Sequence, residues 1–364
     1  MRNSVQRSNM KSVFLLFIGI IVFTFLLIGC SSAVTTVTPI EGEEGNNQQG
    51  NASEVTLVIG AYSVAKDAIE ELLPLFQEKW LAETGQKVIY QQSYEASGTQ
   101  ARAIIGGFDA DIAILAMEGD IDTIEAAGLI THDWRNNEHK GMISRSIVVL
   151  GAREGNPLLI QDWNDLTRSD VRVLYPNPKT SGGAQWDINA IFGAGLKLSE
   201  QELGYADEQY AKNFLKQIHA NVESLDKSGR ASMAAFEYGV GDVIVTYENE
   251  LRARISKGIA YEIIIPEHTI LIENPIAIID KHVDEHQNRE VAQAFYDYMM
   301  SAEAQTIFVK HGFRAVNEQV AADSQDQFEQ PADLFDIEYL GGWDHVREVL
   351  YSKRGIWYQV LADL

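Results

Sequence analysis

Small polar residues and glycines recur in this sequence at four points where a predicted strand gives way to a predicted helix. They are Ser63, Ser97-Gly98, the run 177–183, and Ser228-Gly229-Arg230. The N-terminus of a helix carries free backbone N–H groups and a partial positive charge, so each junction can donate hydrogen bonds to a negative ligand. Four such ends directed at one cleft would form a site made almost entirely of donors. The ligand suited to that chemistry is a small, fully ionised oxyanion.

Helix capping is the competing interpretation of each serine taken singly, because serine and glycine are common cap and turn residues. The run Thr180-Ser181-Gly182-Gly183 goes beyond what a cap requires. Consecutive glycines carry no β-carbon and let the backbone approach a ligand closely. This run is therefore the strongest single indication of a ligand site in the sequence.

Signatures of catalysis and of metal binding are weak by comparison. The sequence contains neither a G-x-x-x-x-G-K-[ST] loop nor a G-x-S-x-G elbow. Its single cysteine, Cys30, precludes an intrachain disulfide and a multi-cysteine metal site. His282 and His286 are four residues apart, but the acidic residues between them favour a solvated turn over a metal pair. We expect no enzymatic activity, no cofactor and no metal.

Strand-like and helix-like segments alternate along the part of the chain that carries the four junctions. Apolar, β-branched runs predict strands at 55–60, 87–90, 111–115, 146–150, 171–174, 242–246, 262–265 and 275–279. Helical spacing of apolar residues predicts helices at 69–80, 99–106, 186–193, 207–220, 289–300, 302–311 and 343–361. Gly85 should stop the first of these helices. This alternation predicts an α/β fold in which helices cover parallel sheets. Ligands of such sheets bind at the carboxyl ends of the strands, which is where the four junctions lie.

The composition is that of a globular protein and narrows the class of partner. Hydrophobic residues make up 46% of the chain and charged residues 22%. The formal charge of −23 argues against a nucleic-acid partner, which needs a clustered basic face. It does not argue against a small anion, because exposed charges are screened beyond about 8 Å. Oriented N–H groups in a closed cleft act at shorter range and in a lower dielectric.

The N-terminus has the three parts of a secretory signal peptide. Three basic residues precede an apolar run at 13–28, and a small residue, Gly29, follows it. The run is short for a membrane-spanning helix, which needs roughly 20 apolar residues. The sequence L-I-G-C, which ends at Cys30, resembles the lipobox of bacterial lipoproteins, whose cysteine is lipidated. An uncleaved signal anchor is the alternative.

The segment after the signal peptide is rich in Ser, Thr, Gly, Asn, Gln and Glu. Such a composition buries too little apolar surface to order itself. The sequence therefore predicts a signal peptide at 1–29, a flexible tether at 30–53, and a folded region from 54 onward.

Three longer segments resemble the sulfate- and thiosulfate-binding proteins of ABC importers. They are Q-S-Y-E-A-S-G-T-Q-A-R-A at 92–103, P-N-P-K-T-S-G-G-A-Q-W at 176–186 and G-V-G-D-V-I-V-T-Y-E-N-E at 239–250. The resemblance extends from about 55 to 314. It implies the α/β, two-lobed type II periplasmic-binding-protein fold, in which each lobe is a mainly parallel sheet flanked by helices. Two chain crossings form the hinge, and the lobes close around a dehydrated anion.

The resemblance also implies a set of uncharged ligand donors. The matching positions are Ser63, Ser97, Ser181, Gly182, Gly183, Gly229 and Tyr247, with Arg230 in support. Three of them depart from the family: Ser63 replaces an aspartate, Gly229 stands in an altered D-K-S-G-R loop, and Tyr247 replaces a tryptophan. The first two changes should be mild because backbone N–H groups bind there. Tyr247 bears on which anion is preferred.

The connectivity of the implied fold divides the chain into discontinuous lobes. We expect a first lobe of 54–142 plus 275–364 and a second lobe of 143–274, with the hinge near 144–150 and 265–275. The predicted helix at 343–361 lies beyond the resemblance, and we expect it to pack on the first lobe.

These observations predict a monomeric extracytoplasmic receptor, held at the outer face of the membrane by a lipidated Cys30. It would deliver sulfate or thiosulfate to an ABC permease with a cytoplasmic ATPase. Sulfate gains no proton between about pH 5 and 8. Because the implied site has no titrating side chain, binding should be nearly independent of pH. Another tetrahedral oxyanion such as molybdate or phosphate, an anion sensor, and an extracytoplasmic hydrolase remain as alternatives.

Overall fold

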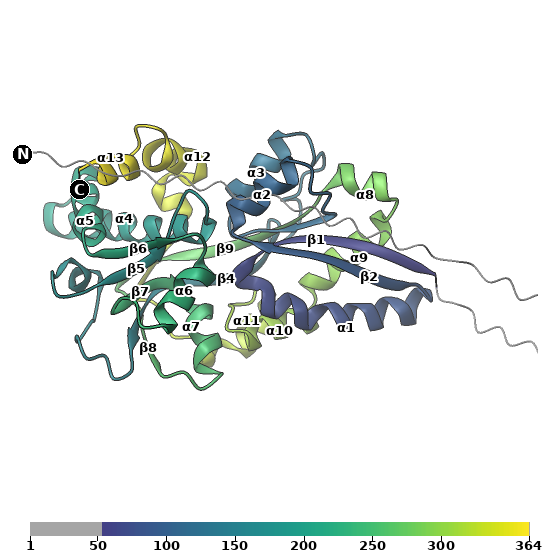
Figure 1. Cartoon of the computed structure of the whole chain (residues 1–364), viewed down its shortest axis with the longest axis horizontal. Coiled ribbons are helices and arrows are strands. Elements are labelled where there is room, and N and C mark those ends of the chain that lie inside the picture. The colour runs from purple at the N-terminus through teal and green to yellow at the C-terminus, as the bar shows by residue number, and fades with distance from the viewer. Residues whose placement is uncertain (1–52, 364) are drawn as a thin grey trace, which may run out of the picture. The chain divides into compact units, whose positions relative to one another are not determined.

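The computed structural model of the protein describes residues 53–363 (Figure 1). The predicted signal peptide at 1–29, the lipidation site Cys30 and all but the last residue of the predicted tether lie outside the described residues. Within 53–363, no helix combines the length and the apolar character needed to cross a membrane.

Within residues 53–363, ten strands form one mixed sheet in the order β2-β1-β3-β9-β4-β7-β5-β6, with β10 paired to β9 and β8 paired to β4. The strands are β1 (Glu54–Tyr62), β2 (Lys87–Glu95), β3 (Ile112–Ile114), β4 (Met142–Arg153), β5 (Val173–Pro176), β6 (Val222–Asp226), β7 (Val243–Tyr247), β8 (Tyr261–Ile264), β9 (His268–Ile278) and β10 (Asp333–Phe335).

Parallel strands gather at the two ends of this order, and antiparallel strands join them. β1 pairs in parallel with β2 and β3, and β5 pairs in parallel with β6 and β7. Between these groups, β4 and β9 pair antiparallel, from Met142 opposite Pro275 to Ile147 opposite Leu271. β4 then continues along β7, and β9 continues along β3. The prediction of two mainly parallel sheets joined by two crossings is confirmed.

Helices follow most of the strands and cover the sheet (Figure 1). They are α1 (Lys66–Thr84), α2 (Ser97–Ile105), α3 (Glu118–Ala126), α4 (Gly182–Leu203), α5 (Glu208–His219), α6 (Gly229–Glu237), α7 (Glu248–Ile255), α8 (Asp280–His286), α9 (Arg289–Met300), α10 (Ala302–Lys310), α11 (Glu318–Asp323), α12 (Gly342–Val346) and α13 (Ile356–Ala362). Short 3-10 turns include η1 (Ser63–Ala65), η2 (Trp163–Thr167), η3 (Gln325–Gln327) and η4 (Ile337–Leu340), and η5 (Arg347–Tyr351) is a π turn.

The apolar stripe predicted for α1 is its buried face. Ile69, Leu72, Leu73, Phe76 and Trp80 are all buried in the main hydrophobic cluster. The helix ends where predicted, because Gly85 adopts a left-handed backbone with φ of 72° and its N–H closes the last turn.

The C-terminal segment differs from the single helix predicted at 343–361. It consists of α12, η5 and α13 in succession. It packs on α4 and α5: the Trp343 ring lies edge-on to Trp186 with centroids 4.8 Å apart, and Trp357 lies 4.9 Å from His219. The Tyr351 hydroxyl donates to Asn189 Oδ1 at 2.8 Å. The expectation that this segment packs on residues of the first lobe is therefore wrong.

The burial of α4 explains this packing. Its residues from Trp186 to Leu196 are almost all buried, on every side of the helix. A helix that is apolar all round needs cover on more than one face. The sheet covers one side of α4, and the C-terminal segment supplies cover beyond it, as Figure 1 shows for α12 and α13.

Candidate functional site

Six of the seven predicted ligand residues line one small cavity. They are Ser63, Ser97, Ser181, Gly183, Gly229 and Tyr247, and Tyr62, Val64, Ala96, Ala116 and Ser228 complete the wall. The cavity leaves a volume of about 10 Å³ for the centre of a water-sized sphere. That is close to the space of a single water molecule, so the cavity suits a small ion and is too small for a sugar or a nucleotide.

Gly182, the seventh predicted residue, lies directly behind this wall. A β-carbon at Gly182 would stand 3.2 Å from the Ser97 Cβ and 3.0 Å from Asp120 Oδ2. Both contacts are tighter than ordinary packing allows. Glycine at this position therefore lets the start of α4 approach the start of α2 closely.

The four predicted junctions supply the cavity with the first residues of helices. Ser63 opens η1 ahead of α1, Ser97 opens α2, and Gly229 opens α6. Ser181 is the N-cap of α4, and its Oγ accepts the Ala184 N–H at 3.3 Å. The first N–H groups of a helix have no intrahelical acceptor, and their end of the helix is positive. The cavity wall is thus rich in donors although it includes no charged side chain.

Two tyrosine hydroxyls are buried at the cavity without a hydrogen-bond partner among residues 53–363. They belong to Tyr62 and Tyr247, each 3% exposed. Burial raises the pKa of both phenols, so both stay protonated. An unpaired buried hydroxyl costs about 1–3 kcal/mol, which a ligand oxygen would relieve. Tyr62 was not predicted; its signal in the sequence is its position at the end of β1, just before Ser63.

Asp120, at the start of α3, adds a titratable group that the sequence analysis missed. Ser97 Oγ donates to Asp120 Oδ2 at 2.5 Å and accepts the Ala116 N–H at 2.9 Å. Burial raises the pKa of Asp120 to about 6, against the lowering effects of the Ser97 hydrogen bond and of Arg102 and Arg347. The sequence-based expectation therefore overlooked a titratable side chain that lies one hydrogen bond from the cavity wall. No helix was predicted at α3, so this carboxyl had no predicted location.

The Ala116 backbone connects the cavity to α4 and to β9, a central strand of the sheet. Its carbonyl accepts Trp186 Nε1 from α4 at 2.7 Å and Asn274 Nδ2 from β9 at 2.9 Å. Its N–H holds the Ser97 hydroxyl, as described above. All of these groups are buried, so the position of Ser97 is fixed by α4 and β9 as well as by its own helix.

Arg230, the predicted supporting residue, does not line the cavity but holds one of its edges. Its Nη2 donates to the carbonyls of Ser63 at 3.3 Å and Val64 at 3.4 Å. Its Nη1 lies 3.5 Å from Asp67 Oδ1. The guanidinium therefore anchors the turn that carries Ser63.

The histidines considered as a metal pair make other contacts. His282 Nδ1 lies 2.8 Å from the Ala110 carbonyl, and His286 Nδ1 lies 2.8 Å from Asp111 Oδ1. In the part of the chain that the structure describes, no group of three or more His, Cys, Asp or Glu side chains converges as a metal site.

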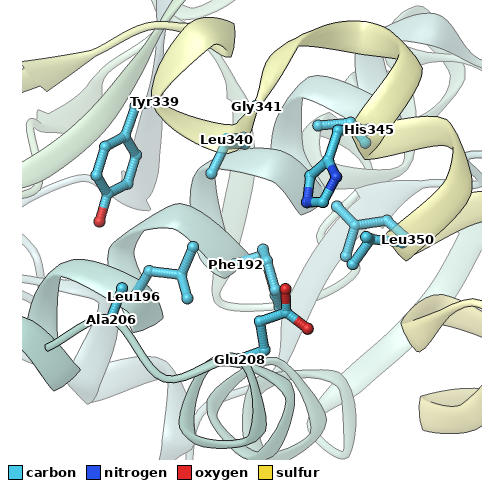
Figure 2. A pocket seen from close by; sticks show the side chains of 11 residues that line it. Phe192, Leu196, Ala206, Glu208, Tyr339, Leu340, Gly341, His345 and Leu350 are labelled. Atoms are coloured by element: carbon cyan, nitrogen blue, oxygen red, sulfur yellow. The ribbon is translucent and has the colours of Figure 1, made fainter.

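A larger pocket lies between α4, the start of α5 and the C-terminal segment (Figure 2). Its volume is about 360 Å³, and most of its lining residues are apolar, Phe192, Leu196 and Leu350 among them, although polar and apolar atoms share its surface about equally. Glu208 and His345 project into it from opposite sides (Figure 2). It contains none of the predicted ligand residues.

Comparison with known proteins gives consistent matches over most of the chain. The family described as bacterial extracellular solute-binding protein matches residues 57–314. The sulfate-binding protein of Synechococcus elongatus is 40% identical over 333 residues, which are 90% of this chain and 93% of that protein. The thiosulfate-binding protein of Escherichia coli is 33% identical and covers 86% of this chain and 93% of its own length. The solved structure of the sulfate-binding protein SubI from Mycobacterium tuberculosis matches with a TM-score of 0.73 at 33% identity, over 82% of this chain and 100% of that one.

Proposed function

Because the chain belongs to the family of bacterial extracellular solute-binding proteins, among the sulfate- and thiosulfate-binding proteins of ABC importers, we propose that its cavity binds sulfate or thiosulfate. Its fold is the type II periplasmic-binding-protein fold, shared with SubI. Its relatives are named as binding proteins rather than as enzymes, and we propose the same passive role for this chain.

One observation carries the proposal: four strand–helix junctions, far apart in the sequence, meet at a cavity of ionic size. The proposed donors are the backbone N–H groups of Ser63, Gly182, Gly183 and Gly229 and the hydroxyls of Ser181 and Tyr247. Ser97 offers its hydroxyl hydrogen only when Asp120 is protonated, because the Asp120 carboxylate otherwise accepts it. We add the Tyr62 hydroxyl, which is buried and unpaired in the described part of the chain. Such donors hold a dianion without a charged partner because they are oriented before the ligand arrives and act in a low dielectric.

Hydrogen phosphate is a second candidate, and the Ser97 hydroxyl is the observation that favours it. Sulfate accepts hydrogen bonds only, whereas hydrogen phosphate also needs an acceptor for its proton. The Ser97 hydrogen is directed at Asp120, which leaves an oxygen lone pair of Ser97 for a ligand proton. The names of the relatives favour sulfate as the ligand, and the geometry of Ser97 makes hydrogen phosphate the second candidate.

Calorimetric titration of the protein produced without residues 1–29 tests the proposal. Sulfate and thiosulfate should bind with micromolar or tighter affinity, and molybdate and phosphate should bind more weakly. Binding of phosphate alone would assign the site to the second candidate. Failure of all four anions to bind would overturn the anion site.

We further propose that the two ends of the sheet belong to lobes that close about β4 and β9. The first lobe would contain 54–142 and 275–332. The second would contain 143–274 together with the C-terminal segment, because β10 pairs with β9 at His268–Ile270 and the segment packs on α4 and α5. Closure would enclose the anion for delivery to an ABC permease.

For attachment to the membrane we propose lipidation of Cys30. The L-I-G-C sequence supports this assignment. A diacylated cysteine anchors stably, whereas a single acyl chain binds a membrane only marginally. Cys30→Ser should abolish incorporation of labelled fatty acid and release the protein from the membrane fraction. Labelled fatty acid on the serine variant would refute the assignment.

A further inference from the structure

Two acidic side chains one turn apart on α1 each contact two basic side chains, but from different parts of the chain. Asp67 Oδ1 lies 3.5 Å from Arg230 Nη1, and Asp67 Oδ2 lies 3.1 Å from Lys257 Nζ. Glu71 lies 2.6 Å from Lys310 Nζ and 2.9 Å from His311 Nε2. The partners of Asp67 belong to α6 and to the end of α7, in the proposed second lobe. The partners of Glu71 belong to the end of α10, in the same lobe as α1.

The Asp67 pairs lie beside the anion cavity. Asp67 is in the first turn of α1, directly after the turn that carries Ser63. Arg230 follows Gly229, and both Ser63 and Gly229 line the cavity. The two segments also pack closely here, since a β-carbon at Gly229 would lie 3.3 Å from Cγ2 of the Val64 side chain. The contact between α1 and α6 is thus part of the cavity edge.

The second lobe holds Arg230 in position for this contact. Its guanidinium lies 3.9 Å from the buried carboxylate of Glu250, which also pairs with Arg254 at 3.1 Å. Arg254 in turn pairs with Glu237 at 2.8 Å. Burial alone would raise the pKa of Asp67, but Arg230 and Lys257 bring it below its ordinary value, so Asp67 is ionised at neutral pH. The cation and the carboxylate that face each other across the cleft are both charged and both positioned.

We propose that Asp67 is a positioning residue that holds the two lobes closed over the bound anion and so slows its release. This inference rests on the proposed function and on the proposed lobes. Opening of the cleft separates Asp67 from Arg230 and Lys257 and leaves the Glu71 pairs intact. A contact present only in the closed state favours that state by its own interaction energy. A second contact of the same kind joins Arg347 of the C-terminal segment to Asp122 of α3 at 3.4 Å, but Asp122 also pairs with Arg135 of its own lobe.

The test compares Asp67→Asn with Glu71→Gln. Each substitution removes one carboxylate charge from the same helix and disrupts two contacts with basic side chains, so effects on net charge are matched. Sulfate and thiosulfate release is followed by stopped-flow tryptophan fluorescence. Because the Asp67 pairs are partly exposed, Asp67→Asn should speed the release of both anions by about 2- to 10-fold. Glu71→Gln should leave release unchanged.

Two further measurements separate a closure role from a direct ligand role. The ratio of sulfate to thiosulfate affinity should be the same in Asp67→Asn as in the wild type, because no ligand donor is removed. Sodium chloride should speed release from the wild type more than from Asp67→Asn, since salt screens the ion pairs and the variant lacks those of Asp67. Asp67→Glu, which keeps the charge, should restore most of the slow release.

The outcomes distinguish this inference from the proposed function. Equal release rates for Asp67→Asn and Glu71→Gln, with a wild type that binds sulfate or thiosulfate, would overturn the closure role alone. Absence of binding by the wild type would overturn the proposed function and this inference with it.

Discussion

The larger pocket and the small anion cavity both lie along α4, but they differ in the properties that decide what each can bind. The larger, next to Phe192 and Leu196, has a volume of about 360 Å³ and is lined mostly by apolar residues. The smaller, at Ser181 and Gly183, leaves about 10 Å³ and is lined by helix N-termini, serines and two unpaired phenols. By volume alone, the larger pocket would be preferred to the small cavity as the ligand site. The chemistry of the wall selects the second, because donors converge there from four separate segments.

The difference between the two sites follows from the different surroundings of the N-terminus and of the middle of α4. The first residues of α4 expose N–H groups that have no intrahelical acceptor. Its middle, at 186–196, is buried on every side and must be covered by the sheet, by α5 and by the C-terminal segment. The larger pocket is therefore interpreted as imperfect packing beneath that cover, and the smaller as the site. Substitutions in one of the two sites, followed by measurements of stability, of anion affinity or of both, test this distinction.

The largest effect is expected at the larger pocket, and only on stability. Leu350 lines that pocket and is 1% exposed. Leu350→Ala should lower the free energy of unfolding by about 2–5 kcal/mol, from lost apolar contact and a residual cavity. Denaturant titration measures the loss, and calorimetry should find sulfate affinity unchanged. A matching loss of sulfate affinity would mean that the C-terminal segment takes part in binding.

At the smaller cavity, Gly182→Pro should have the largest effect on binding. Proline removes the Gly182 N–H and adds ring carbons at a position where even an added β-carbon would lie only 3.0 Å from Asp120 Oδ2. The position is the first residue of α4, where proline is compatible with the helix itself. Sulfate affinity should fall by at least about 100-fold, since a hydrogen bond to a charged group and close packing are lost together.

Gly182→Ala is the matched control, because alanine adds the β-carbon and keeps the N–H. Calorimetry on both variants separates crowding from the loss of the donor. If the alanine variant loses as much affinity as the proline variant, close packing rather than the N–H accounts for the effect. Micromolar affinity in the proline variant would count against the glycine run as part of the site.

A smaller effect is expected from Tyr247→Phe, and its sign should differ between stability and binding. The Tyr247 hydroxyl is buried and unpaired in the described structure, so its removal should leave the ligand-free protein at least as stable. Removal should also leave one sulfate oxygen without a donor, at a cost of roughly 1–3 kcal/mol or about 5- to 150-fold in affinity. Thermal unfolding and calorimetry measure the two effects. Unchanged sulfate affinity would make Tyr247 a packing residue.

Tyr247→Trp tests selectivity at the same position. An indole N–H can only donate, whereas a phenol hydroxyl can donate or accept. The tryptophan variant should keep sulfate binding and bind hydrogen phosphate more weakly than the wild type. Stronger phosphate binding by the tryptophan variant would contradict this account of Tyr247.

How far the sequence predicts the molecule depends on how local each signal is. The stripe of α1, its stop at Gly85 and the strand–helix junctions were predicted because each depends on a few neighbouring residues. The glycine run at 180–183 was informative because few other roles require consecutive glycines at a strand end. The convergence of Ser63, Ser97, Ser181 and Gly229 on one cavity was implied by resemblance, since junctions this far apart in sequence have no local reason to meet.

The features that were missed depend on tertiary contacts. Asp120 acquires its properties from burial against Ser97, and nothing in its neighbouring sequence indicates that burial. The C-terminal segment was assigned to the wrong partner because its aromatic residues fit any apolar face. The identity of that face is set by the all-round burial of α4, which is visible only in the folded chain.

The smallest effect on sulfate affinity is expected from pH, and it sharpens the contrast between the anion cavity and the larger pocket. Sulfate gains no proton between about pH 5 and 8, so a change in its affinity in that range must come from the protein. Burial raises the pKa of Asp120 to about 6. Below that pH the protonated carboxyl can donate to Ser97 Oγ, and the serine hydrogen becomes free for the anion. Above it the carboxylate keeps that hydrogen.

Sulfate affinity should therefore fall as pH rises through about 6 and level off near neutrality. The change should be roughly 2- to 12-fold, the net value of one hydrogen bond. Calorimetry from pH 5 to 8 should find this dependence in the wild type and a flat profile in Asp120→Asn. A flat profile in the wild type would show that Asp120 holds one protonation state throughout and that Ser97 does not switch between donor and acceptor.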